Sequence, residues 1–179
     1  MIATIRPAGL EDAAGIARVH VDSWRSSYKG LIADEFLAAL SYERRTEVWS
    51  QYLSDLQHGR FLYVAETRPS EIVGFVSAGP GREGDLEYQG ELNAIYLLQL
   101  AQGQGLGRRL VDQVMHELCK RSFSSMLLWV LKDNQPARKF YEAVGGETLR
   151  ERPIKIGNQV LIEVAYGWKN LATLVSKKE

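Results

Sequence analysis

A glycine-rich turn between an apolar strand and an amphipathic helix constrains this chain more than any other stretch. We predict a buried strand over residues 92–98, the turn over residues 102–107, and a helix to about Arg121. One face of that helix is apolar at helical spacing: Leu106, Leu110, Val111, Val114 and Leu118. Glycines 103, 105 and 107 lack Cβ atoms, so the backbone can approach a ligand at a helix N-terminus that favours anions. The stretch therefore predicts a seat for a phosphate or pyrophosphate.

The spacing of the turn excludes two common phosphate loops. A Walker loop ends in Gly-Lys-Ser/Thr, whereas Arg108 and Arg109 follow Gly107 here. A dinucleotide fingerprint needs a third glycine at the position of Arg108, and an acidic residue about 20 residues further on, where Cys119 and Lys120 stand. A nucleotide-dependent kinase or a dehydrogenase is therefore disfavoured.

The composition indicates one folded domain over residues 1–179, with a tail from about residue 169. The chain is 45% apolar, which suits a single sizeable core. Its 22 basic and 22 acidic side chains balance, so charge gives no reason to expect nucleic acid or an anionic membrane as a partner. No secretory apolar segment follows Met1, and no run approaches 18 apolar residues. With one cysteine in the chain, we expect a cytoplasmic protein.

The isolated reactive side chains do not form a site of their own. Cys119 falls beside the apolar face of the central helix and is expected to pack as a small hydrophobe. His20, His58 and His116 show no metal-ligand spacing, so we expect surface or packing roles and no bound metal.

The remaining elements alternate between helices and strands. We predict helices over residues 10–21, 34–40, 42–56 and 136–144, with Ser41 as an N-cap, and strands over residues 4–7, 61–66, 72–78, 126–131, 147–156 and 159–168. Residues 22–31 lack clear periodicity and are predicted to be a loop. In it, Trp24 and Tyr28 either line a substrate pocket or anchor the loop to the core.

An acidic cluster precedes the central strand. It consists of Glu83, Asp85, Glu87 and Glu91. A solvated charged face is one explanation, and attraction of a cationic substrate is the other.

Two motifs together resemble the Gcn5-related N-acetyltransferase superfamily. The first is Gln102-x-x-Gly105-x-Gly107, and the second, after the next strand, is Asn134-x-x-Ala137-x-x-Phe140-Tyr141-x-x-x-Gly145. The resemblance covers residues 91–146, and the rest of the chain fits in element order. Gly146 departs from the pattern, because the family commonly has Phe there. The resemblance implies an α/β fold of the α+β type. Its mixed, mostly antiparallel sheet is flanked by helices and splayed at a central parallel strand pair.

The resemblance also implies a role for each matching residue. Ile95, Tyr96 and Leu97 would pair with the pantetheine arm of acetyl-CoA. The pyrophosphate and adjoining cofactor contacts would come from Gln102, Gly103, Gln104, Gly105, Leu106, Gly107 and Arg108. Asn134 would contact the cofactor or act as a helix N-cap. Tyr141 would protonate the leaving thiolate.

The identity of the general base is left open by the resemblance. Glu91 lies where some members carry a glutamate base, and it would act directly or through water. A covalent route through Cys119 is disfavoured, because Cys119 lies about three helical turns beyond Gly107.

The implied function is transfer of an acetyl group from acetyl-CoA to a primary amine by direct attack in a ternary complex. A small polyamine-like or otherwise aminated molecule would bind near Trp24, Tyr28 and Glu91. Acetylation of protein N-termini or lysines, and a non-catalytic acyl-CoA sensor, are the alternatives. We expect a monomer or a homodimer.

Overall fold

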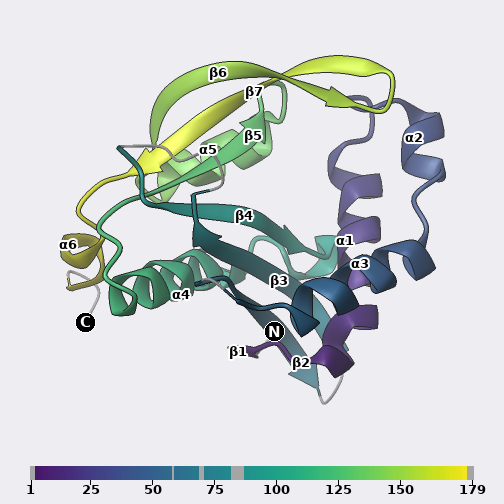
Figure 1. Ribbon diagram of the computed structural model, residues 1–179. Coiled ribbons are helices and arrows are strands. Elements are labelled where there is room, and N and C mark those ends of the chain that lie inside the picture. The colour runs from purple at the N-terminus through teal and green to yellow at the C-terminus, as the bar shows by residue number, and fades with distance from the viewer. Residues whose placement is uncertain (1–2, 58, 69–70, 82–86, 177–179) are drawn as a thin grey trace.

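The protein folds around one seven-stranded mixed sheet, as seen in the computed structural model, which describes residues 3–57, 59–68, 71–81 and 87–176. Its strands, in spatial order, are β1 (Thr4–Pro7), β2 (Phe61–Arg68), β3 (Glu71–Pro80), β4 (Gly90–Leu97), β5 (Met126–Leu131), β7 (Gln159–Trp168) and β6 (Glu147–Ile156). Every neighbouring pair is antiparallel except β4 and β5 (Figure 1).

The parallel pair β4–β5 separates soon after it begins. Only Gly90 with Met126 and Glu91 with Leu127 are in register as partners. The β3–β4 ladder also shifts register between Ser77 and Ala78, which marks a bulge opposite the start of β4. Beyond that point, β4 continues along β3 while β5 continues along β7. A gap therefore opens in the middle of the sheet.

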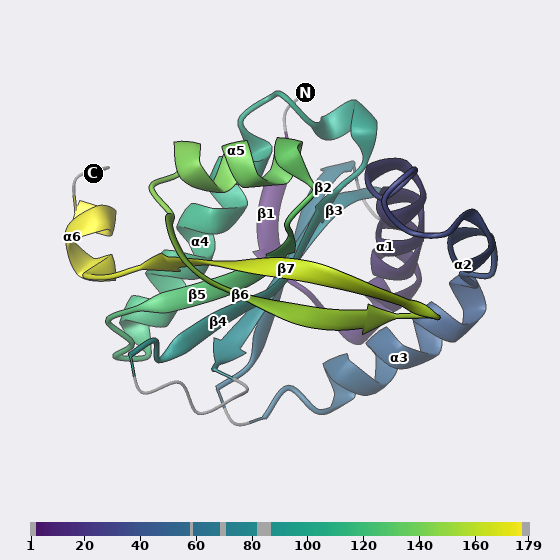
Figure 2. The same ribbon diagram turned by 90° about the horizontal axis from the view of Figure 1, so that it is seen from above.

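Helices cover both faces of the sheet and border this gap (Figures 1 and 2). They are α1 (Ala13–Ser27), α2 (Asp34–Ala38), α3 (Tyr42–Ser54), α4 (Leu106–Lys120), α5 (Gln135–Ala143) and α6 (Leu171–Ser176), with 3-10 turns at Leu10–Asp12 and Gln99–Ala101. One face is covered by α1, which α3 backs, and α4 lies under the other. The C-terminal end of α1 and the N-terminal ends of α4 and α5 converge where β4 and β5 part.

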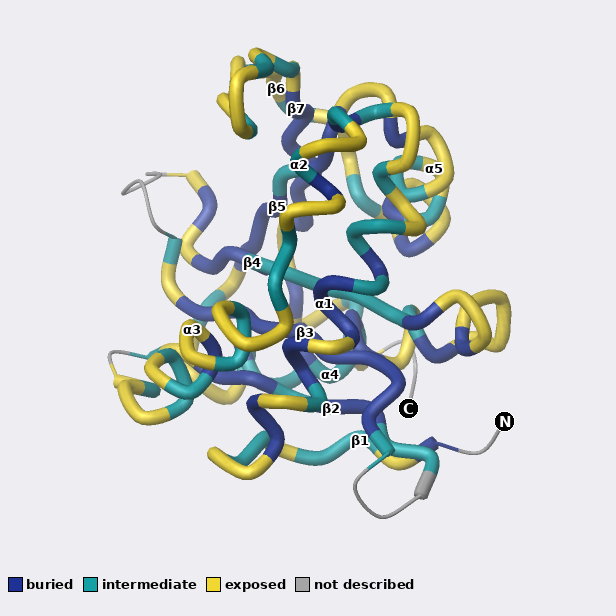
Figure 3. Tube along the Cα trace, turned by 90° about the vertical axis from the view of Figure 1, so that its right-hand side faces the viewer, coloured by how far each residue is buried: buried dark blue, intermediate teal, exposed yellow. Residues whose placement is uncertain are grey.

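The buried apolar side chains form two clusters. The main core runs through the strands and the inner faces of α1 and α4, as the buried segments of Figure 3 show. A second cluster has Ile32, Leu37 and Leu131 at its centre, with Trp24 and Phe36 among its partly buried members. It joins the α1–α2 region to the β6–β7 hairpin across the gap.

The predicted loop over residues 22–31 is wrong in its first half, because α1 continues to Ser27. His20, Ser23 and Trp24 follow one another at helical spacing and turn toward the sheet or the second cluster. Serines and aromatic residues alternate with charged residues here, which concealed the apolar face from a hydrophobicity pattern.

The tail predicted from about residue 169 contains a short helix. Residues 171–176 form α6, and the Leu171 side chain is fully buried. The predicted strand Met126–Leu131 and the terminal hairpin are confirmed with the same bounds. Ser41 is confirmed as the N-cap of α3, because its hydroxyl accepts a hydrogen bond from the Arg44 N–H at 3.2 Å.

Membrane-spanning helices and metal-binding groups were searched for among the described residues. No helix there is long and apolar enough to cross a membrane, and no group of His, Cys, Asp or Glu side chains there could hold a metal ion. His58, Glu83 and Asp85 lie outside the described residues.

Candidate active site

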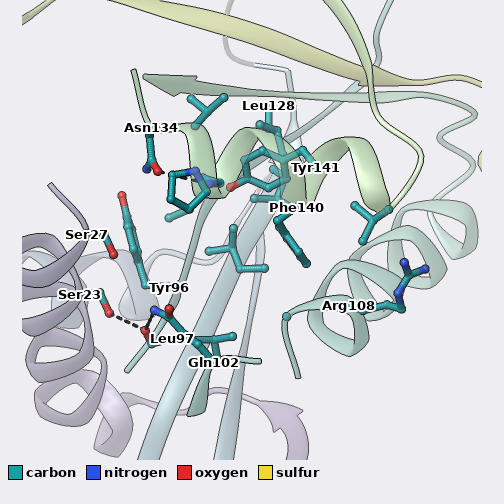
Figure 4. A pocket seen from close by; sticks show the side chains of 18 of the residues that line it. Ser23, Ser27, Tyr96, Leu97, Gln102, Arg108, Leu128, Asn134, Phe140 and Tyr141 are labelled. Carbon is teal, nitrogen blue, oxygen red and sulfur yellow. Dashed lines mark hydrogen bonds between the residues drawn. The ribbon is translucent and has the colours of Figure 1, made fainter. Parts of the chain in front are cut away.

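A cavity of about 680 Å³ occupies the gap between β4 and β5. It is bounded by the C-terminal end of α1, the glycine-rich turn before α4, and α5 (Figure 4). Its lining residues are Ser23, Ser26, Ser27, Tyr28, Leu92, Asn93, Ala94, Ile95, Tyr96, Leu97, Gln99, Gln102, Gly103, Gly105, Gly107, Arg108, Leu128, Trp129, Val130, Asn134, Pro136, Ala137, Phe140, Tyr141, Ala143 and Val144. Most of the sequence-predicted site residues therefore meet in one place.

The glycine-rich turn forms one end of this cavity. Gly103 and Gly105 have φ angles of 71° and 77°, in the left-handed region that favours glycine, and Gly105 is the N-cap of α4. A Cβ atom at either position would have no neighbour within 4 Å among the described residues, so there is open space beside both glycines. The first N–H groups of a helix have no partner within it and carry a partial positive charge. This end of the cavity is therefore suited to an anionic group.

Gly107 lines the cavity and also lies against α5. A Cβ atom there would lie 3.2 Å from Cζ of Phe140, so glycine permits close packing of α4 against α5. Glycine at this position therefore permits the contact between the two helices at one side of the cavity.

Polar side chains fix the turn to its surroundings. The Gln102 side-chain amide donates to the Leu97 carbonyl at 3.0 Å, and the Arg108 guanidinium donates to the Ala143 carbonyl at 2.7 Å. Arg108 thus links α4 to α5 and places a positive charge beside the turn. Gln104 donates to the Leu100 carbonyl and Leu106 is buried, and neither side chain is part of the cavity lining.

The backbone of β4 has an unpaired edge along the cavity. The Leu98 N–H donates to the Val73 carbonyl on β3 at 2.9 Å. Backbone groups point alternately to the two sides of an antiparallel strand, so Tyr96 also faces β3, whereas Ile95 and Leu97 face away from it. On that side β5 has already separated from β4. The Leu97 carbonyl is occupied by Ser23 and Gln102, which leaves the Ile95 and Leu97 N–H groups directed toward the cavity.

Tyr141 projects from α5 into the middle of the cavity (Figure 4). Its side chain is 8% exposed and packs beside the rings of Phe140, Tyr166 and Trp168. None of the residues that the structure describes hydrogen-bonds to its hydroxyl. Burial, and after it the nearby Tyr96 hydroxyl, raises the pKa of Tyr141 well above its usual value. The phenol therefore keeps its proton at neutral pH and can donate it to a developing anion.

Asn134 begins α5 and borders the same space. Its Oδ1 accepts a hydrogen bond from the Ala137 N–H at 3.3 Å, so it is an N-cap, and the side chain also lines the cavity. The two roles weighed for this residue are compatible, because an amide has an acceptor for the helix and donors for a ligand.

The Trp24–Tyr28 pair is divided between the cavity and the core. Tyr28 lines the cavity, and its hydroxyl lies 3.4 Å from that of Tyr96. Burial raises the pKa of both phenols. Trp24 packs in the second cluster, with its ring centroid 6.2 Å from that of Phe36, and is not among the lining residues.

Glu91 stands at the point where β4 and β5 are still paired. It is 3% exposed, and it precedes the first residue of β4 that lines the cavity, Leu92. Cys119 also lies outside the cavity, and burial raises the pKa of its thiol, as expected of a packing residue.

Polar lining residues that the sequence interpretation missed include Ser23, Ser27 and Asn93. The serines were hidden by the missed end of α1. Asn93 lies on β4 next to the bulge, and its Oδ1 is buried without a hydrogen-bond partner among the described residues. A polar residue inside an otherwise apolar strand was the available signal.

Comparison with known proteins agrees with this geometry. The model of the acetyltransferase (GNAT) family matches residues 20–145. The chain belongs to this family. One relative, the uncharacterized N-acetyltransferase YuaI of Bacillus subtilis, is 39% identical over 171 residues, which cover 96% of this chain and 95% of YuaI. The mycothiol acetyltransferase of Rhodococcus erythropolis is 34% identical over 76% of this chain but only 44% of its own length.

Solved structures of GNAT proteins share the fold. PaiA N-acetyltransferase of Thermoplasma acidophilum, in complex with coenzyme A, has a TM-score of 0.69 at 20% identity, over 91% of this chain and 98% of its own. YncA, a putative acetyltransferase of Salmonella typhimurium with acetyl-CoA, has a TM-score of 0.69 at 20% identity, over 94% of both chains. These structures share the fold, and the family match together with the relationship to YuaI identifies this GNAT protein as an N-acetyltransferase.

Proposed function

We propose that this GNAT protein transfers the acetyl group of acetyl-CoA to a primary amine inside the cavity between β4 and β5. The observation that carries the proposal is the meeting of three features in one space. They are the open glycine turn at the N-terminus of α4, the unpaired edge of β4, and the unbonded Tyr141 hydroxyl.

Each feature suits a different part of the cofactor. The turn at Gly103 and Gly105 provides backbone N–H groups and room for a pyrophosphate, and Arg108 adds a positive charge. The N–H groups of Ile95 and Leu97 suit the amide-bearing pantetheine arm, as an added strand would. One of them can also polarise the thioester carbonyl as negative charge develops on its oxygen.

The chemistry that remains is displacement of a thiolate by an amine. The nitrogen forms a bond to the acetyl carbon, and the carbon–sulfur bond breaks. Tyr141 donates its proton to the departing sulfur, and the nitrogen loses one proton when the amide forms. In this route the amine attacks acetyl-CoA directly while both are bound. Cys119 takes no part, because it is outside the cavity.

The test is free-thiol release from acetyl-CoA with a panel of amines, for the wild type and for Tyr141→Phe. We expect the substitution to lower kcat by roughly 10²-fold, the lower end of typical acid–base contributions, with acetyl-CoA affinity retained. Tyr63→Phe is the matched control, since its hydroxyl bonds to Glu117 away from the cavity. Acetyl-CoA binding without turnover by any amine would favour the sensor alternative, and absence of binding would refute the proposal.

A further inference from the structure

The described wall of the cavity holds no acidic side chain and no histidine. Its titratable groups are Arg108 and the phenols Tyr28, Tyr96 and Tyr141. Other polar groups on the wall are neutral, such as Ser27 and Asn93. A cationic ammonium entering this space would leave water and meet no carboxylate on the described wall, which is costly in a partly closed, low-dielectric site.

Two buried carboxylates on the strands around the cavity, Glu163 and Glu91, are not part of its lining. On β7, Glu163 is 6% exposed and pairs with the Arg152 side chain at 2.5 Å. Glu91 is buried at the closed end of the β4–β5 pair, before the wall begins. Neither carboxylate belongs to the lining.

The other titratable groups are poor proton acceptors. His20 lies behind Tyr96, with ring centroids 5.0 Å apart, and its Nδ1 accepts from the Trp49 indole N–H. Burial, with the positive charge of Arg45, lowers the pKa of His20 to about 3. Burial also raises the pKa of Tyr28 and Tyr96, so these phenols hold their protons at neutral pH.

We propose that the acceptor reacts as the uncharged free base of a weakly basic amine, an α-amino group next to a neutral carbonyl. This inference rests on the proposed acetyl transfer and narrows its substrate class. It disfavours the ammonium groups of polyamines and of lysine side chains. The amine need not transfer a proton to the wall before it attacks.

The protonation equilibrium of the amine supports this choice. An α-amino group has a pKa of about 7.7–8.0, so about a fifth to a third of it is free base at pH 7.4, whereas an alkylamine with a pKa of about 10.4 is about 0.1% free base. The neutral groups on the wall match the same chemistry. Hydroxyl groups can donate to a carbonyl, and the unpartnered Oδ1 of Asn93 can accept from an amine N–H.

The experiment measures kcat/KM against pH for pairs of acceptors that differ by one carboxamide. The pairs are glycinamide and methylamine, alaninamide and ethylamine, leucinamide and 3-methylbutylamine, and phenylalaninamide and 2-phenylethylamine. Spermidine is included as the polyamine. A tripeptide amide that begins with the best residue distinguishes a free amino-acid amide from a peptide N-terminus as the source of the α-amino group.

We expect kcat/KM to rise tenfold per pH unit up to the pKa of each acceptor itself, so that the midpoint moves by about 2.5 pH units within a pair. At pH 7.4 the carboxamide member should be favoured by about tenfold or more. Glu91→Gln should not change the pH midpoint of kcat/KM for any acceptor.

Three outcomes would overturn the inference while acetyl transfer stands. They are a midpoint that is the same for every acceptor, a preference for spermidine or the alkylamines at pH 7.4, and acetylation of none of the α-amino compounds. Loss of the pH dependence in Glu91→Gln would assign the base to Glu91 and overturn it too. If acetyl-CoA neither binds nor releases thiol, the proposed function itself fails.

Discussion

At the scale of single residues, burial rather than ion pairing sets the protonation states around the cavity. His20 shows this most clearly: it is 7% exposed, and its Nδ1 accepts from Trp49 at 3.1 Å while its Nε2 has no partner among the described residues. Burial, together with the positive charge of Arg45, lowers the pKa of His20 and so favours the neutral imidazole beneath Tyr96. The same aromatic packing that shapes the cavity wall therefore depends on pH.

His20 should make the protein less stable in mild acid. Its pKa falls from 6.5 to about 3 on folding, so the unfolded state binds the extra proton. This contribution is complete above pH 6.5 and is lost as the pH falls toward 3, by about 2 kcal/mol between pH 7 and pH 5. Urea unfolding at both pH values measures it. His20→Gln should remove that difference, and His116→Gln, on the outer part of α4, should keep it. Equal pH dependence in wild type and His20→Gln would contradict the assignment.

At the scale of elements, two glycines with similar backbone angles separate the conformational need for glycine from contact with acetyl-CoA. Gly105 in the turn before α4 and Gly30 in the α1–α2 connection have φ angles of 77° and 78°, and neither has a neighbour within 4 Å of a built Cβ. Glutamate at either position should cost about 1–2 kcal/mol of stability through the left-handed backbone. Gly105→Glu should in addition weaken acetyl-CoA binding by at least about tenfold, through steric and like-charge conflict. Calorimetric titration of the two variants checks this, and equal affinities would remove the turn from the cofactor site.

The splayed edge of β4 offers a second test at this scale. The Ile95 and Leu97 N–H groups face the gap, whereas the alternation of the ladder directs the Tyr96 N–H to β3. Acetyl-CoA should slow hydrogen exchange at Ile95 and Leu97 and leave Tyr96 nearly unchanged, as measured residue by residue by NMR. Protection that is equal at all three positions would indicate general stabilisation instead of pairing along this edge.

Local patterns predicted most elements, because their signals lie within the elements themselves. The signals for the apolar strand Met126–Leu131 and for the N-cap Ser41 each depend on a few neighbouring residues. The end of α1 was missed, since Ser23 and Trp24 face partners that are distant in the chain. The same limitation applies to the site. The sequence brought Gly105, Asn134 and Tyr141 together through their motifs, but only the fold shows that Gly107 packs on Phe140.

At the scale of the whole molecule, the gap in the sheet is bridged by contacts between the β6–β7 hairpin and α2. The β6–β7 hairpin reaches α2, where the Gln159 side-chain oxygen accepts from the Ala33 N–H at 2.6 Å (Figure 1). A Cβ atom on Gly157 would lie 2.8 Å from the Phe36 ring, so the turn and the ring are closely packed. The second cluster thus connects the two halves of the sheet on the side of Tyr28, which lines the cavity.

Weakening the contacts between the β6–β7 hairpin and α2 should change the KM for the acceptor more than the affinity for acetyl-CoA. Phe36→Ala removes a partly buried ring between α2 and the hairpin, and we expect the acceptor KM to rise by roughly tenfold, equivalent to about 1.4 kcal/mol of lost positioning. Acetyl-CoA affinity should stay within about twofold, because the glycine turn is held separately by Gln102 and Arg108. Phe123→Ala is the matched control, a partly buried ring packed on the main core away from the cavity. If both substitutions change the acceptor KM equally, general destabilisation explains the effect, and the bridge has no specific part in holding the acceptor.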